Sequence, residues 1–179
     1  PLPPVTLVLG GARSGKSTVG EYLQGKYAYH PLAFATPIKQ ALSRICGWDM
    51  ALLNGEKGDR EAVDPMWGFS PRQAMQHLGA SMRGLAPTIW LLSTMQTVRR
   101  LNGAEVPVCI TDVRHHNEVD AIHEAGGVVW RCHRQGAGLA GEKALHESEV
   151  HVPELSVDLE LDNNGTLDEL WAQVDLAIR

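Results

Sequence analysis

The chain has 179 residues, of which 44% are hydrophobic and 21% charged, and its net charge is −5 at neutral pH. This composition predicts one globular domain over residues 1–179, and the acidic balance argues against binding nucleic acid through phosphate attraction. Three cysteines without metal-type spacing, and apolar runs too short for a signal peptide or a membrane span, favour a cytoplasmic protein that does not bind membranes.

The first predicted element is a buried strand over residues 5–9, followed by the segment GGARSGKS at residues 10–17. This segment fits the phosphate-loop pattern G-x-x-x-x-G-K-[ST], and a helix can follow it, as the motif requires. In such a loop, backbone N–H groups and the helix N-terminus surround phosphate oxygens. Lys16 is predicted to contact the β- and γ-phosphates of a nucleoside triphosphate, and Ser17 to ligate Mg²⁺. The predicted ATP-binding residues of the loop are Gly11, Arg13, Ser14, Gly15, Lys16, Ser17 and Thr18.

A short strand is predicted over residues 29–34, followed by a helix with Thr36 as its N-cap, Pro37 in its first turn and Gly47 after its end. The apolar residues at helical spacing in this helix are Ile38, Ala41, Leu42 and Ile45. Residues 49–69 have no periodicity, and a loop of this length is functional, mobile or a solvated surface excursion.

The next helix is predicted to start at Ser70-Pro71, with an apolar stripe of Met75, Leu78 and Met82. A second stripe on this helix suits an anionic, hydrogen-bonding ligand, although an ordinary polar outer face has the same spacing. This second stripe, on the helix that starts at Ser70-Pro71, consists of Arg72, Gln76, Gly79 and Arg83. A further helix is predicted over residues 88–101.

A buried strand over residues 106–111 is followed directly by Asp112-Val113-Arg114. Because ligands of open α/β sheets bind at the carboxyl ends of strands, these residues are predicted to lie at the edge that carries the phosphate loop. Asp112 can order Mg²⁺ or its waters, and Arg114 can bind a phosphate. The alternative is that this pair caps the next helix.

A strand over residues 127–132 precedes a segment rich in glycine and basic residues, predicted as a lid over about residues 133–145. Arg134 is predicted to reach the transferring phosphoryl group when the lid closes, and Arg131 to orient the nucleotide from the strand. A last strand covers residues 155–161. The capping box Thr166-x-x-Glu169 then begins a helix with Leu167, Leu170, Trp171 and Val174 buried.

Several arginines after a phosphate loop, together with a lid, favour phosphoryl transfer between two bound small molecules, because that reaction needs positioning and positive charge. The sequence contains no N-K-x-D guanine signature. Two alternatives stay open: a kinase of another small acceptor, and a nucleotide-binding module without turnover.

Taken together, the motifs resemble those of the bacteriophage-type deoxynucleoside monophosphate kinases over nearly the whole chain. Departures occur at Ala80-Ser81-Met82-Arg83 and at His115, and they leave the preferred base open. The motifs that carry the resemblance are residues 10–17; Phe34-Ala35-x-Pro37-Ile38-Lys39; Ser70-Pro71-Arg72 with Gln76 and Leu78-Gly79; Asp112-Val113-Arg114 with Asn117-Glu118; Arg131-x-x-Arg134; His146-x-Ser148-Glu149; and Asn164-Gly165-Thr166-Leu167.

The resemblance implies an α/β, three-layer phosphate-loop kinase fold, with a parallel sheet flanked by helices, an acceptor-binding insertion and a lid. It also implies ATP and Mg²⁺ as co-substrates, a deoxynucleoside monophosphate as acceptor, and allows a homodimer. The catalytic residues would be Lys16, Asp112 and Arg134, with Ser17 and Asp112 at the metal. The acceptor-binding residues would be Lys39, Arg72, Gln76, Arg114 and Glu149.

Overall fold

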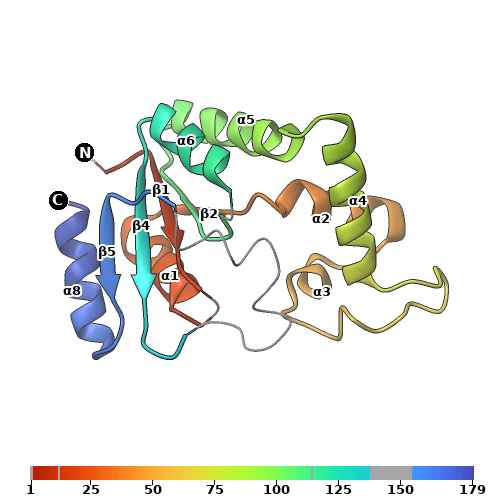
Figure 1. Ribbon diagram of the computed structural model, residues 1–179, viewed down its shortest axis with the longest axis horizontal. Helices are drawn as coiled ribbons and strands as arrows, with labels where there is room; N and C mark the ends of the chain where they lie inside the picture. Colours follow the sequence, from red (N-terminus) through yellow and green to blue (C-terminus); the bar gives the residue numbers. More distant parts are fainter. Residues whose placement is uncertain (1, 12, 114, 138–154) are drawn as a thin grey trace. The chain divides into compact units, whose positions relative to one another are not determined.

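The computed structural model describes residues 2–11, 13–113, 115–137 and 155–179. The chain forms two compact units (Figure 1). Unit 1 consists of Pro1–Ala33 and Thr97–Arg179, and unit 2 of Phe34–Gln96. Within the described residues, no helix is both long enough and apolar enough to cross a membrane.

Unit 1 is built on a parallel sheet of five strands in the order β2-β3-β1-β4-β5. In the register of the central strands, Leu7 lies opposite Ile110 on one side and Val129 on the other. This arrangement confirms the predicted α/β class. The strands are β1 (Val5–Leu9), β2 (His30–Leu32), β3 (Val108–Ile110), β4 (Val128–His133) and β5 (Leu159–Asp162).

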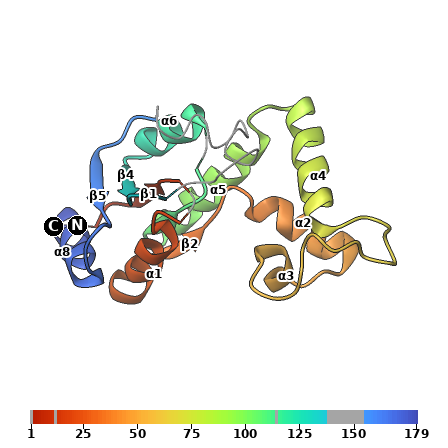
Figure 2. The same cartoon turned by 60° about the horizontal axis from the view of Figure 1, so that its bottom comes forward.

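Helices cover both faces of this sheet, which is why all five residues of β1 are buried and four of them are aliphatic. On one face, Val8 belongs to a core cluster with Val19 of α1 (Lys16–Tyr27) and Val174 of α8 (Leu167–Ala177). On the other, Val5 and Ile122 of α6 (His116–Glu124) both lie against Gly127. Figure 2 shows α1 and α8 below the strands and α6 above them.

Unit 2 is helical. It contains α2 (Thr36–Cys46), α3 (Met50–Asn54), α4 (Pro71–Leu85) and the first part of α5 (Ile89–Gly103), which continues into unit 1. Helix α4 begins as predicted, because the Ser70 hydroxyl accepts from Gln73 N and the Gln73 side chain accepts from Ser70 N. The core of unit 2 consists of Ile38, Leu42, Trp48 and Leu53, with Met75 and Leu78 packed against it.

Several local predictions were wrong. Helix α2 begins at Thr36 itself, and its N-cap is Ala35, which makes no side-chain cap hydrogen bond. The predicted loop after position 49 starts with α3, because the Asp49 carboxylate caps this short helix by accepting from Ala51 N at 3.0 Å. Leu167, predicted to be buried, is 54% exposed, and Ile45, an apolar residue at helical spacing on α2, is 64% exposed. The predicted strand at residues 29–34 is only the three residues of β2.

Candidate active site

The phosphate loop joins β1 to α1, and its backbone requires glycine at two positions. Gly10 has a φ of 146°, and a β-carbon there would lie 2.5 Å from the Cys132 carbonyl oxygen. Gly15, the N-cap of α1, has a φ of 108°. The Lys16 ammonium donates to the Gly11 carbonyl at 2.8 Å, so this side chain folds back over the loop. These features give the chain the tight turn that a phosphate cradle needs.

A cavity of about 370 Å³ opens at this loop. It brings together most of the phosphate-loop residues that the sequence predicted to bind ATP, and it adds Arg134, the predicted catalytic arginine. Arg134 is exposed and directly follows β4. The lining residues are Arg13, Gly15, Lys16, Ser17, Thr18, Arg134, Asn163 and Leu167.

Asp112 follows β3 by two residues, and β3 is the neighbour of β1 in the sheet. Its position is therefore at the strand ends that carry the phosphate loop, as predicted. Helix α1 approaches this strand end closely, because a β-carbon on Gly20 would lie 3.1 Å from Cγ2 of Thr111. Arg114, Glu149 and residues 138–145 of the predicted lid lie outside the described residues.

The sequence prediction for Arg131 placed it at the nucleotide, whereas its described contacts are with β5 and the residues before it. Its guanidinium donates to Glu160 Oε1 at 2.8 Å and to the Leu155 carbonyl at 2.5 Å. Successive strand residues point to opposite faces, and the next residue, Cys132, donates to the Ser14 carbonyl. Arg131 is thus anchored on the face opposite the phosphate-loop contact, and its role toward ATP stays a prediction.

Sequence reasoning missed two cavity residues, Asn163 and Leu167. Asn163 is almost fully buried, and its amide donates to the Ser14 carbonyl at 2.8 Å. Leu167 is the first residue of α8, a position that the helical periodicity assigned to the core. The available signal was the turn at residues 163–165 after a strand, which places these residues at the same sheet edge as the phosphate loop.

Of the residues in unit 2 that were predicted to bind the acceptor substrate, Arg72 and Lys39 each contact another side chain of the unit. Arg72 Nε lies 3.4 Å from Glu61 Oε1, and the Arg72 side chain is 43% exposed. Lys39 donates to Asn54 Oδ1 at 2.9 Å. Gln76 is exposed, whereas Gly79 of the same predicted stripe is buried.

Gly79 packs within unit 2 rather than facing a ligand. A β-carbon there would lie 3.3 Å from Cδ1 of Ile38, so the glycine lets α4 approach α2. Its carbonyl accepts a hydrogen bond from the Trp90 indole at 3.1 Å. Gly79 is therefore a packing residue, and ligand contacts of the other members of the stripe stay a prediction.

A second cavity, of about 310 Å³, lies beside the amino-terminal residues of β1 and β3, where Pro4 and Pro107 line it. Its lining is mainly apolar and lies at the opposite end of the strands from the phosphate loop. The cavity with the cationic side chains is the one suited to phosphates.

No model of a known protein family matches the chain. A protein of Acanthamoeba polyphaga mimivirus with the name "Putative deoxynucleotide monophosphate kinase" is 31% identical over 180 residues, which are 93% of this chain and 92% of that protein. Among solved structures, a dephospho-CoA kinase from Campylobacter jejuni aligns with a TM-score of 0.57 at 12% identity, over 98% of this chain and 95% of that chain.

A shikimate kinase from Aquifex aeolicus aligns with a TM-score of 0.51 at 14% identity, over 97% of this chain and 94% of that chain. At these identities the two solved structures show the fold alone. The mimivirus protein matches at higher identity and over nearly its whole length. The chain therefore belongs to the deoxynucleotide monophosphate kinase family, and it is a phosphotransferase with the phosphate-loop kinase fold.

Proposed function

We propose that this chain transfers the γ-phosphoryl group of ATP to a deoxynucleoside monophosphate, giving a deoxynucleoside diphosphate and ADP. The observation that carries the proposal is the cavity at the phosphate loop, where Arg13, Lys16, Ser17 and Arg134 line one space. Three cationic side chains around a phosphate-binding backbone suit a triphosphate, and membership of this kinase family supports the choice of acceptor.

Lys16 and Arg134 supply positive charge where the reaction builds negative charge. An oxygen of the acceptor phosphate forms a bond to the γ-phosphorus, while the bond from that phosphorus to the bridging oxygen breaks and ADP leaves. Lys16 is held over the loop by the Gly11 carbonyl, so its ammonium is already positioned for the phosphate oxygens. Such prepositioned charge is worth several kcal/mol of barrier, on the order of 3 kcal/mol for one group.

Ser17 and Asp112 are the residues that would hold Mg²⁺. Both offer oxygen atoms, which Mg²⁺ prefers. Ser17 lines the cavity, and Asp112 follows the strand next to β1. When bound, the ion neutralises phosphate charge and orients the phosphate oxygens. The two residues fit this task because each comes from a different strand end at the same sheet edge.

For the acceptor, we assign Arg72 to the phosphate and Gln76, one turn along α4, to the base side. Lys39, Arg114 and Glu149 complete the proposed set. The partner of Arg72 in the free protein is Glu61, whose side chain is 64% exposed. Exposed ion pairs of this kind are worth at most about 1 kcal/mol, so an incoming phosphate can replace the carboxylate.

The test is ADP release measured with ATP and each deoxy- and ribonucleoside monophosphate in turn. We expect release that depends on a deoxynucleoside monophosphate. Lys16→Ala should stay folded, because its side chain is not part of the core, and should lose roughly 10²-fold or more in kcat. ADP release with another small acceptor only, or ATP binding without any acceptor-dependent turnover, would contradict the proposed reaction.

A further inference from the structure

The backbone carbonyl of Ser14 is held by two side chains that come from elsewhere in the sheet. The Asn163 amide donates to this oxygen at 2.8 Å, and the Cys132 thiol donates to it at 3.1 Å. Burial raises the pKa of Cys132 to about 11, so the thiol carries its proton at neutral pH. A loop carbonyl with two such donors has one strongly preferred direction, into the protein.

The direction of the Ser14 carbonyl also sets the direction of the Gly15 N–H, because both belong to the same peptide group. Because a trans peptide is planar, the N–H of Gly15 points away from the side on which the Ser14 oxygen lies. The Ser14 oxygen faces Asn163 and Cys132, and Gly15 lines the phosphate-loop cavity. The Gly15 N–H therefore lies on the side of this peptide opposite the two donors, and Gly15 itself lines the phosphate-loop cavity. A glycine leaves this peptide free to rotate, so the hydrogen bonds to Ser14 decide its orientation.

Asn163 is well placed to impose that orientation, because its own position is fixed from three sides. Its backbone N–H donates to the His133 carbonyl at the end of β4 at 2.8 Å. The Gln173 side chain of α8 makes two hydrogen bonds to the backbone of Asp162, the residue before Asn163. It accepts from Asp162 N and donates to Asp162 O, both at 2.8 Å. A β-carbon on Gly15 would collide with the Asn163 amide, so the two residues are in direct contact.

We propose that Asn163 is a positioning residue for phosphoryl transfer: by holding the Ser14 carbonyl, it keeps the Gly15 N–H aimed at the phosphates of ATP. The inference rests on the proposed function only in taking ATP as the phosphoryl donor. The amide is a neutral donor to a neutral carbonyl, and losing such a bond with its geometric effect should weaken ATP binding roughly tenfold.

The first test compares Asn163→Ala with Asn164→Ala by calorimetric titration with ATP in the absence of acceptor, and by thermal unfolding without nucleotide. Asn164 belongs to the same turn, where it contacts Asp162 and accepts from Gln135 N at 2.7 Å. We expect Asn163→Ala to raise the Kd for ATP about tenfold and Asn164→Ala to leave it within about twofold. An unchanged Kd in Asn163→Ala, or the same loss in both variants, would overturn the proposal.

The second test uses Asn163→Asp, which keeps the shape of the side chain. An ionised carboxylate has no proton to donate to the Ser14 carbonyl, whereas a protonated carboxyl does. The Kd of this variant relative to that of the unmodified protein should therefore fall as the pH is lowered through the pKa of the introduced group. Asn164→Asp controls for the added charge. A ratio that does not change with pH, or that changes equally in both variants, would refute the positioning role.

These measurements separate the two proposals because they contain no acceptor. A protein that binds ATP with the expected dependence on Asn163 but phosphorylates no deoxynucleoside monophosphate would refute the proposed reaction and leave the role of Asn163 intact. The reverse result, turnover with deoxynucleoside monophosphates and an ATP affinity indifferent to Asn163, would refute the positioning role alone.

Discussion

The side chains around the phosphate loop either line the cavity or form hydrogen bonds to the backbone of the loop, and Asn163 does both. Lys16 and Arg134 are cationic residues that line the cavity. Cys132 and Asn163 act on the Ser14 carbonyl. A charge in the cavity interacts with the substrate directly, whereas a hydrogen bond to the loop determines where the backbone donors point.

Arg134→Ala should lower kcat more than it raises either KM. The residue is exposed at the end of β4, and we expect its contact with the phosphoryl group to form chiefly in the transition state. A loss of about 10²-fold in kcat is expected from removal of one such charge. Steady-state kinetics with both substrates varied would measure it, and Arg100→Ala, at an exposed position on α5, is the control. A higher KM for ATP at unchanged kcat would instead indicate ground-state binding.

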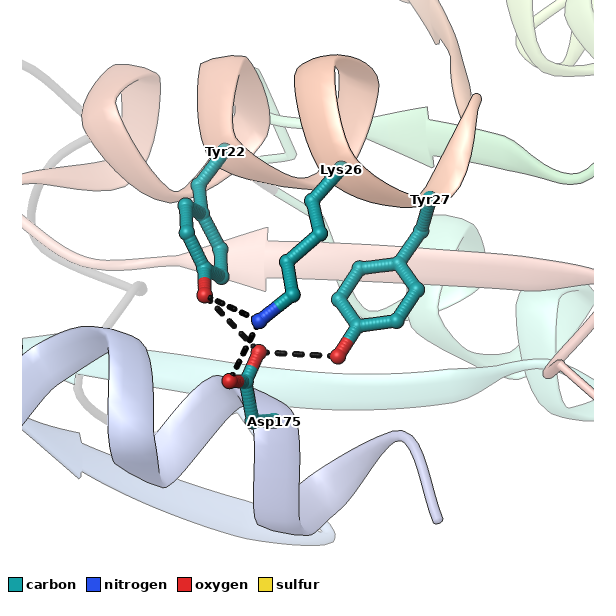
Figure 3. A network of polar contacts seen from close by, with 4 residues as sticks. All are labelled: Tyr22, Lys26, Tyr27 and Asp175. Atoms are coloured by element: carbon teal, nitrogen blue, oxygen red, sulfur yellow. Dashed lines mark hydrogen bonds and ion pairs between the residues drawn. The ribbon is translucent and has the colours of Figure 1, made fainter.

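At the scale of elements, α1 and α8 are joined by a ring contact and by a network of hydrogen bonds around Asp175, which Figure 3 shows. The Tyr22 ring stacks on Trp171, with centroids 4.1 Å apart and an interplanar angle of 3°. Asp175 of α8 accepts hydrogen bonds from Tyr22 at 2.9 Å, from Tyr27 at 2.8 Å and from Lys26 at 2.6 Å. This cluster fixes the helix that carries Lys16 against the helix that follows the Asn163 turn.

The same cluster predicts how stability depends on pH. The hydrogen bonds from Lys26 and Tyr27 lower the pKa of Asp175 to about 2. The pKa of an aspartate in the unfolded chain is about 3.9, so the stabilisation by Asp175 is present above this pH and is lost as the pH falls toward 2. Asp175→Asn should therefore lower the Tm at pH 7, with the difference from the unmodified protein shrinking below about pH 4.

Thermal unfolding followed by circular dichroism between pH 2 and pH 8 would measure this difference. Asp120→Asn, at an exposed position on α6, is a control of the same chemistry. The Tm of the control should follow that of the unmodified protein at every pH. A constant Tm difference between Asp175→Asn and the unmodified protein down to pH 2 would mean that shape, rather than charge, accounts for the contribution of Asp175.

At the scale of the whole molecule, the predicted ligand-binding residues are divided between the two units. The residues that line the phosphate-loop cavity all belong to unit 1, and Lys39, Arg72 and Gln76 all belong to unit 2. Each unit has its own apolar core: that of unit 1 includes Val8 and Val174, and that of unit 2 includes Leu42 and Leu53. A substitution at the surface of one unit is therefore expected to leave the ligand affinity of the other unchanged.

Arg72→Ala should raise the KM for the deoxynucleoside monophosphate by roughly 10-fold or more and lower kcat, while the Kd for ATP stays the same. Glu61→Gln is the informative companion, because it removes the ion-pair partner at 3.4 Å and keeps the guanidinium. It should not raise the KM of the acceptor. If the ATP affinity of Arg72→Ala collapses while the acceptor KM is unchanged, the two sites have been assigned to the wrong units.

Much of this architecture was predictable because its causes are local in the chain. A strand buried on both faces is mostly apolar, so β1, in which four of five residues are aliphatic, is visible in the sequence. The phosphate loop depends on glycines a few residues apart, and α8 begins at the capping box of Thr166 and Glu169, three residues apart. The family resemblance, confirmed by the mimivirus relative, rested on the order of such local motifs.

Contacts between residues that are far apart in the sequence became known only from the tertiary structure. Asn163 and Ser14 are separated by 149 positions, and no periodicity connects a turn after the last strand with a carbonyl in the phosphate loop. Leu167 fits the apolar stripe of its helix, yet it lies in the first turn, at the rim of the cavity, and is exposed. Hydrophobic spacing shows which face of a helix can be buried, whereas the neighbouring elements determine how far along that face the burial extends.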